Sequence, residues 1–278
     1  MQKIAIIASS KDTAGVNIRN NLIEIFDFEQ TNDKFDNNTV HEYNKIKHKI
    51  IKLYLIDDDL IYSESIDRKI EADILIFVSK HRSKENMPTF TIHPIGNWNN
   101  ADFGGQEKKL CFSSAVLFKN LFIELNKITK NTNYISTMEA THHGPYVEKP
   151  AIFVEIGSKE TEWNNNLNGE IIAKTIINAL KNQNNKYKFA FGIGGPHYCN
   201  NFNKIILRTD FAFSHICPKY MLEKLDEEMI TQAIKKTLEK IDFVVLDWKG
   251  LGTEKQRIVE LLKNFNIEVK RTDQVLKD

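Results

Sequence analysis

Residues 73–83 read "DILIFVSKHRS", a continuous apolar run that passes directly into a polar tail. Such a run predicts a strand buried on both faces, and the tail predicts where the strand leaves the sheet. Residues 3–9 and 151–158 have the same character, and the helical pattern of residues 13–26 follows the first of them. We further expect strands at 133–140, 187–195, 204–208, 242–247 and 267–270, and helices at 113–128, 169–180, 218–240 and 254–265.

Strands that alternate with helices predict an α/β fold with three layers, α/β/α, around a mixed, mostly parallel sheet. The chain has 278 residues and 41% apolar content, and neither an internal repeat nor a linker is visible. We therefore expect a single domain over residues 1–278, with a loop from the end of the 73–79 strand to about residue 105.

The composition limits the kinds of partner and compartment that we expect for this chain. A net charge of +1 gives no general attraction to polyanions, so nucleic acid binding would need a local basic patch. Three cysteines at wide spacing argue against a disulfide framework. No apolar run is long enough to span a membrane and no signal peptide is recognisable, so we expect a cytoplasmic protein without a membrane partner.

Polar side chains recur where the expected strands end. His81 follows the 73–79 strand, "EATHHGP" (139–145) follows another, Glu155 lies within a third, and His197 follows a fourth. In open α/β sheets, ligands bind in the crevice beyond the carboxyl ends of the strands. We therefore expect these side chains to meet in one site.

Several imidazoles with carboxylates are the donors that zinc prefers, and zinc with one open position activates water near neutral pH. Neighbouring residues of an extended segment point to opposite faces, so one of His142 and His143 would bind metal unless Gly144 and Pro145 turn the chain. The spacing does not match the His-Glu-x-x-His helix of metalloproteases, so the spacing by itself does not indicate a metal site. The alternative is that these histidines are hydrogen-bonded parts of the structure.

Other features leave two interpretations open. "SSKDTAG" (9–15) is either an anion site at a helix amino terminus or a helix start capped by Asp12 or Thr13. Lys249 is either a phosphate ligand or a solvated lysine, and Cys199 is either a metal ligand or nucleophile or a core residue.

The segments "SSKDTAGVNI", "SKHRS", "HPIGNW", "EATHHGP", "FVEIGS", "GIGGPHY", "SHICPKY" and "DWKG", with Trp163, follow one another over roughly residues 2–270. In this order they resemble the archaeal and plant type of D-aminoacyl-tRNA deacylase. The resemblance implies hydrolysis of the ester between a D-amino acid and the terminal ribose of tRNA, a zinc cofactor, and a phosphorylase/hydrolase-like fold akin to peptidyl-tRNA hydrolase. Ile95 and Pro196 stand where glycines are usual in the pattern.

Residue roles follow from the resemblance and the strand-end pattern together. We expect catalytic roles for Glu139, Thr141, Glu155 and Tyr198; zinc ligation by His81, His142, His143 and His197; substrate contacts from Asp12, His93 and Asn97; and tRNA contacts from Lys80, Arg82, Lys84, Lys149, Lys204 and Lys249. D-Aminoacyl-tRNA is the expected partner of a chain that acts as a monomer. The alternatives are a metal-dependent peptidase or amidase and a non-catalytic protein that binds an anion or metal.

Overall fold

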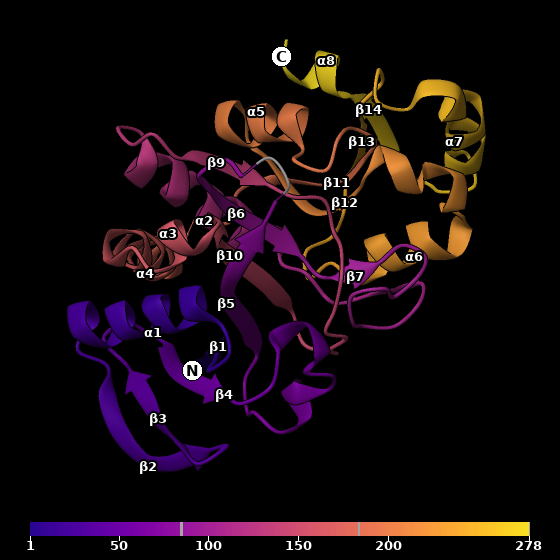
Figure 1. The fold of residues 1–278 in the computed structure, drawn as a ribbon. Helices are drawn as coiled ribbons and strands as arrows, with labels where there is room; N and C mark the ends of the chain where they lie inside the picture. The colour runs from indigo at the N-terminus through magenta and orange to yellow at the C-terminus, as the bar shows by residue number, and fades with distance from the viewer. Residues whose placement is uncertain (84–85, 183, 278) are drawn as a thin grey trace.

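The computed structural model describes residues 1–83, 86–182 and 184–277, and its strands form two main sheets (Figure 1). The strands of the larger sheet are β1 (Gln2–Ser9), β2 (Glu29–Phe35), β3 (Asn38–Tyr43), β4 (Lys49–Ile56), β5 (Ile74–Arg82), β6 (Thr89–Pro94), β9 (Ile135–Met138) and β10 (Ala151–Ser158). Their spatial order is β2-β3-β4-β1-β5-β10-β6-β9. The centre, β4-β1-β5-β10, is parallel, whereas β6 runs antiparallel to β10.

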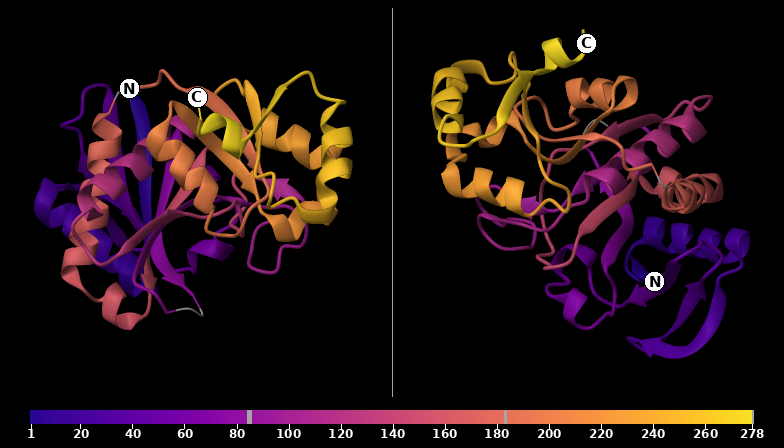
Figure 2. Two further views of the ribbon diagram at one scale, coloured as in Figure 1. Left: turned by 90° about the horizontal axis from the view of Figure 1, so that it is seen from above. Right: turned by 180° about the vertical axis from the view of Figure 1, so that it is seen from behind.

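The smaller sheet is wholly parallel, in the order β12-β11-β13-β14. Its strands are β11 (Lys188–Ile193), β12 (Phe211–Cys217), β13 (Phe243–Leu246) and β14 (Glu268–Arg271), and a separate short pair is β7 (Gly96–Asn97) and β8 (Lys109–Leu110). In Figure 2 the orange and yellow carboxyl-terminal segments lie together on one side of the molecule, beside the indigo and purple amino-terminal sheet.

Alternation along the central strands explains the layers. In β5, Ile76 and Val78 face a core shared with helices, whereas Leu75 and Phe77 face a second core on the other side of the sheet. The α-helices are α1 (Thr13–Phe26), α2 (Ala115–Thr129), α3 (Glu160–Trp163), α4 (Asn166–Lys181), α5 (Asn200–Arg208), α6 (Glu227–Lys235), α7 (Lys255–Leu262) and α8 (Thr272–Val275). Helices α1 to α4 pack on the first face of the larger sheet.

Loops and the 3-10 turns η1 (Leu60–Tyr62) and η2 (Ile66–Arg68) cover the second face of that sheet. The expected α/β fold with a mixed, mostly parallel sheet is confirmed. The difference is that loops and 3-10 turns, where helices were expected, form the third layer over the larger sheet. One core includes Val78 of the larger sheet and Phe213 of the smaller sheet, together with Phe118 of α2. This shared core supports a single domain over residues 1–278, which stays a prediction. No described helix is long and apolar enough to span a membrane.

Some expected elements are wrong. Residues 204–208, expected as a strand, belong to α5, where Phe202, Ile205 and Ile206 are buried at helical spacing. The expected loop up to residue 105 contains the buried strand β6. Strands β2 to β4 and β12 were not predicted. Most residues of β2 and β3 are polar, and polar residues interrupt the apolar sequence of β4 and β12.

We expect a Gly15→Ala substitution to destabilise the protein, although alanine favours helices. A Cβ at Gly15 would lie 2.6 Å from the main-chain oxygen of Val78, so α1 would have to move off β5. The clash should lower the free energy of unfolding by about 1–3 kcal/mol, which exceeds the helix-propensity gain of ~1 kcal/mol. Urea unfolding measures the change. Asn20→Ala on the exposed side of α1 is the control and should be neutral. A Gly15→Ala variant more stable than the parent would contradict this packing.

Candidate metal centre

Three neighbouring strands bring the site together on one face of the larger sheet. Registers pair Glu155 of β10 with Ser79 of β5 on one side and with Thr91 of β6 on the other. Two residues earlier, Phe153 pairs with His93 in the same way. Residues in register point to the same face, so these side chains form rows across the sheet. The site therefore lies on the sheet face, not beyond its carboxyl edge as expected.

Glu155 is held firmly within its row. Ser79 Oγ donates to one carboxylate oxygen at 2.6 Å and Thr91 Oγ1 donates to the other at 3.1 Å. Burial alone would raise the pKa of Glu155, but the hydrogen bond from His81 and the neighbouring His93 imidazole lower it below its usual value. Glu155 is therefore an anion at neutral pH.

His81 lies between two buried carboxylates. Its Nδ1 is 3.1 Å from Glu139 Oε1 and 3.5 Å from Glu155 Oε2, and its Nε2 is 3.1 Å from the Tyr198 hydroxyl. Burial acts to lower the pKa of His81, but its hydrogen bond to Glu155 and the two negative charges raise it to about 9. Gly157 beside it is required, since a Cβ there would lie 2.8 Å from the His81 ring. His81 thus carries positive charge, which does not suit the expected role as a zinc ligand.

The paired histidines point the same way. His143 has a φ of +47°, which breaks the extended alternation, and the rings of His142 and His143 lie 4.4 Å apart. The extended alternation, from which only one of the two was expected to bind metal unless Gly144 and Pro145 turned the chain, is absent, because the chain turns at His143 itself. The His93 ring lies 4.1 Å from His142 and 4.8 Å from His143.

All three rings bind main-chain carbonyls through Nδ1. His93 Nδ1 donates to Pro94 O at 3.1 Å, His142 Nδ1 to Ala140 O at 2.8 Å, and His143 Nδ1 to Gly144 O at 2.6 Å. A carbonyl accepts only, so in each neutral ring the free lone pair is on Nε2.

Burial keeps the paired rings uncharged. Desolvation, with the neighbouring imidazoles, lowers the pKa of His142 well below its ordinary value and lowers that of His143 to about 4. Both rings are therefore neutral at pH 7 and free to bind a cation.

The smaller sheet contributes His197. The 139–143 segment lies against it, since Ala140 N donates to His197 O at 2.8 Å. His197 Nε2 is 3.0 Å from Glu139 Oε2, and the His197 and His142 ring centroids are 4.7 Å apart. Glu139 is wholly buried; desolvation opposes its charge, but the hydrogen bond to His197 and the surrounding imidazoles lower its pKa to about 2.

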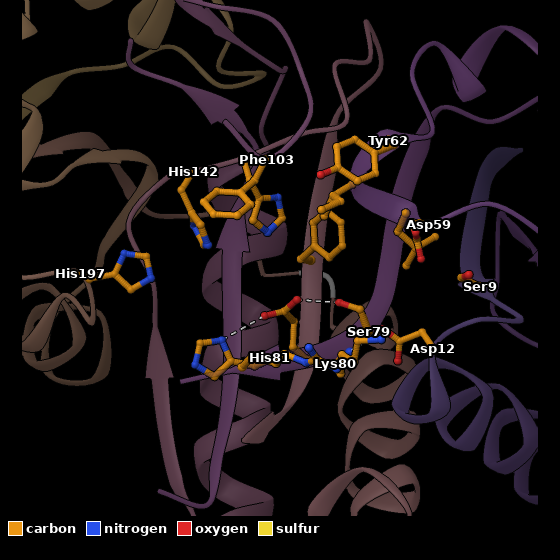
Figure 3. Close-up of a pocket in the computed structure, with 16 residues that line it drawn as sticks. Ser9, Asp12, Asp59, Tyr62, Ser79, Lys80, His81, Phe103, His142 and His197 are labelled. Atoms are coloured by element: carbon orange, nitrogen blue, oxygen red, sulfur yellow. Dashed lines mark hydrogen bonds and ion pairs between the residues drawn. The ribbon is translucent and has the colours of Figure 1, made fainter. Parts of the chain in front are cut away.

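These residues open onto one pocket of about 530 Å³, within the range of ligand sites (Figure 3). Its polar side is formed by His81, His142, His143, Glu155 and His197, and its other side by residues that include Leu60, Ile61, Tyr62 and Phe103. Polar and apolar surfaces therefore face the same space.

Three residues for which a role in the site was expected make hydrogen bonds to main-chain groups. Thr141, expected to be catalytic, is fully buried; its Oγ1 accepts from Ile216 N at 3.0 Å, and its carbonyl accepts from Trp98 Nε1 at 3.1 Å. Asn97, expected to bind substrate, donates to Gly104 O at 2.9 Å. Asp12 caps α1 by accepting from Gly15 N at 2.9 Å, which favours the capping interpretation over an anion site. It also lines the pocket, so its expected contact with substrate stays a prediction.

Other expected residues lie close to the site without lining the pocket. Tyr198 lies behind His81, at the hydroxyl contact given above. His93, expected to bind substrate, joins the imidazole group instead. The two-residue period of Thr89, Thr91 and His93 is the signal that could have placed it there. Cys199 is buried, and desolvation raises the pKa of its thiol well above normal, in favour of the core interpretation.

Two of the expected tRNA-binding residues line the pocket. Lys80 Nζ lies 3.9 Å from Asp12 Oδ2, and the Arg82 guanidinium lies 5.2 Å from the Trp163 ring centroid. Both leave a cationic group at the rim of the pocket.

The remaining expected basic residues are dispersed. Lys204 is exposed on α5 and Lys249 is exposed after β13. Lys149 precedes β10, at the end remote from Gly157, and borders a different hollow beside Lys3, so its expected place at this pocket is wrong. Lys84 lies outside the described residues.

Three overlapping groups have ligand atoms within 4.8 Å of one another: His93, His142 and His143; Glu139, His142 and His197; and His81, Glu139 and Glu155. His93 Nε2 is buried without a hydrogen-bond partner. A buried imidazole lone pair beside two similar ones is costly unless a cation binds it. The first group therefore fits zinc, with nitrogen donors whose orientation is already fixed by second hydrogen bonds.

Comparison with known proteins shows the family of this chain. A family model described as D-aminoacyl-tRNA deacylase matches residues 68–270. The D-aminoacyl-tRNA deacylase of Thermococcus onnurineus is 39% identical over 92% of this chain and 95% of its own length, and that of Thermococcus kodakarensis is 38% identical over 91% and 93%. A crystal structure described as a conserved protein of unknown function matches with a TM-score of 0.89 at 32% identity, over 100% of this chain and 97% of that chain. This chain therefore belongs to the D-aminoacyl-tRNA deacylase family, hydrolases of the aminoacyl-tRNA ester bond.

Proposed function

We propose that this protein hydrolyses the ester between a D-amino acid and the terminal ribose of tRNA, with zinc held by His93, His142 and His143. The observation that carries the proposal is the group of three imidazoles whose ligand atoms lie within 4.8 Å of one another, each with its Nδ1 bound to a main-chain carbonyl oxygen. Three protein ligands with one open position are typical of catalytic zinc.

Zinc, when bound there, supplies a Lewis acid and makes water nucleophilic near neutral pH. Glu155 is the carboxylate of the cluster that lines the pocket, and it is ionised, so it accepts the proton of the attacking water. His81 holds positive charge beside it, which stabilises the negative charge that develops on the ester carbonyl. Glu139 stays behind the imidazoles, where it orients His197.

The pocket rim suits an anionic substrate. Lys80 and Arg82 lie at the edge of the same pocket and are placed to contact phosphates of the tRNA end. The ribose hydroxyl leaves more easily than an amine, so the ester needs no acyl-enzyme intermediate. An aminoacyl-tRNA, with phosphates beside the ester, is thus a substrate that the cationic rim favours.

We expect zinc content and deacylation to be lost together in a His142→Ala variant. His142 belongs to two of the three ligand groups, and removal of a ligand should cost more than about 100-fold in turnover, beyond the effect of a residue that only orients one. The measurement is the release of D-tyrosine from D-tyrosyl-tRNA, with zinc quantified in the same preparation. Chelation of the parent protein should abolish release, and added zinc should restore it.

The exposed His48, on the loop before β4, gives the control: a His48→Asn variant should retain both zinc and activity. L-Tyrosyl-tRNA and a simple peptide are assayed alongside. Cleavage of the peptide would favour the peptidase alternative, and zinc binding without any turnover would favour the non-catalytic one. A folded His142→Ala variant with turnover close to the parent rate would remove the proposed site.

We expect the zinc-free protein to lose stability as the pH rises. The folded-state pKa of His81, about 9, lies above its ordinary 6.5, so its contribution is fully present below 6.5 and is lost as the pH passes 9. The loss should be on the order of 3 kcal/mol. Urea unfolding with a chelator, from about pH 6 to about pH 10, measures it.

A His81→Asn variant isolates this effect, because all other groups titrate in both proteins. Its unfolding free energy should change less with pH than that of the parent across this window. Parallel profiles for the two proteins would show that His81 is not charged in the native state.

A further inference from the structure

The apolar side of the pocket contains two aromatic rings that are largely open to solvent. Phe103 is 65% exposed and Tyr62 is 57% exposed, although both line the pocket. Figure 3 shows them on the side of the pocket away from His81 and Ser79, with Phe103 next to His142. Phe103 and Tyr62 therefore expose aromatic surface at the mouth of the pocket. Exposed apolar surface of this kind commonly marks a binding site.

The segment that carries Phe103 is fixed from several directions. Gly144 N donates to Phe103 O at 3.0 Å, Asn97 Nδ2 donates to Gly104 O at 2.9 Å, and the Glu64 carboxylate accepts from Gly105 N at 2.7 Å. Three independent hydrogen bonds therefore hold a loop whose most prominent side chain points to solvent. This arrangement fixes the backbone of the loop before any ligand arrives, which lowers the entropy cost of ordering it on binding.

The same contacts join Phe103 to the imidazole group. A Cβ at Gly144 would overlap the backbone of Gly104 and Gly105, and a Cβ at Gly104 would lie 3.2 Å from the Tyr62 ring. Gly144 directly follows His143. The backbone that carries Phe103 therefore packs directly against the segment that follows His143 and against Tyr62, which fixes where Phe103 emerges relative to the candidate metal ligands.

We propose that Phe103 and Tyr62 bind the terminal adenine base of tRNA by stacking, and so place the ester against the imidazole group. The inference rests on the proposed function. The base and the esterified hydroxyl belong to the same ribose, so a base must lie near the reacting carbonyl. The amino acid can enter the pocket fully, but the nucleotide must connect to the rest of the tRNA outside, and the exposed rings lie at that outer position. Stacking suits every tRNA, since all end in the same adenosine.

Fluorescence of the base itself gives a direct test. In uncharged tRNA that carries 2-aminopurine in place of the terminal adenine, stacking on Phe103 should quench emission when the parent protein binds. A Phe103→Ala variant should abolish most of the quenching, and Phe103→Tyr, which keeps the ring, should restore it. Quenching of equal size in the parent and in Phe103→Ala, or none in the parent, would overturn the proposal. This readout needs no turnover, so it stands apart from failure of the proposed hydrolysis.

Kinetics distinguish the base from the amino acid as the occupant. For D-tyrosyl-tRNA, Phe103→Ala should raise KM by roughly 5- to 100-fold, the range that corresponds to loss of one stacked ring, with a smaller change in kcat. D-Alanyl-tRNA should show the same increase, because the base is unchanged. An increase confined to D-tyrosyl-tRNA would place the amino acid side chain on Phe103 and refute the inference. Leu167→Ala, which removes a 64% exposed side chain on α4 outside the pocket, is the matched control.

Discussion

The hydrogen bonds from three imidazole Nδ1 atoms to main-chain carbonyl oxygens are the constraint on which the site depends. Each bond fixes both the orientation and the tautomer of its ring, and the ligand atoms of His93, His142 and His143 lie within 4.8 Å of one another. The carbonyls belong to the backbone of β6 and of the 139–144 segment, which the sheet itself holds in place. A small shift of either segment would separate the three nitrogens.

Electrostatics supplies the second half of the arrangement. Two buried carboxylates, Glu139 and Glu155, would repel each other and favour protonation if they were alone. His81 between them keeps both ionised, and thereby gives up its own capacity to bind a metal. Uncharged imidazoles therefore form the candidate metal site, whereas a charged imidazole stabilises the carboxylates. The aromatic wall around Phe103 is attached to the first group through Gly144, which links substrate position to metal position.

The sequence indicated which segments meet at the site. It was less informative about the strand pairing that brings them together and about which side chains face the pocket. His81, Glu139, His142, Glu155 and His197 were expected to converge because each lies in or just after a strand, and they do lie together. The antiparallel pairing of β6 with β10 is a long-range contact that no local sequence pattern specifies. It places Thr91 and His93 beside Glu155 and Phe153, so that the site lies on the face of the sheet. Polar residues near a site look alike in sequence whether they face a ligand or a main-chain group, which is why Thr141 and Asn97 were misassigned.

X-ray absorption at the zinc edge of the zinc-loaded protein tests the central claim most directly. We predict a first shell of nitrogen and oxygen near 2.0–2.1 Å with the outer-shell scattering of about three imidazoles, which falls by about one imidazole when His93 is replaced by alanine. A shell of oxygen atoms alone, sulfur ligation, or a spectrum that His93→Ala leaves unchanged would contradict a three-histidine centre.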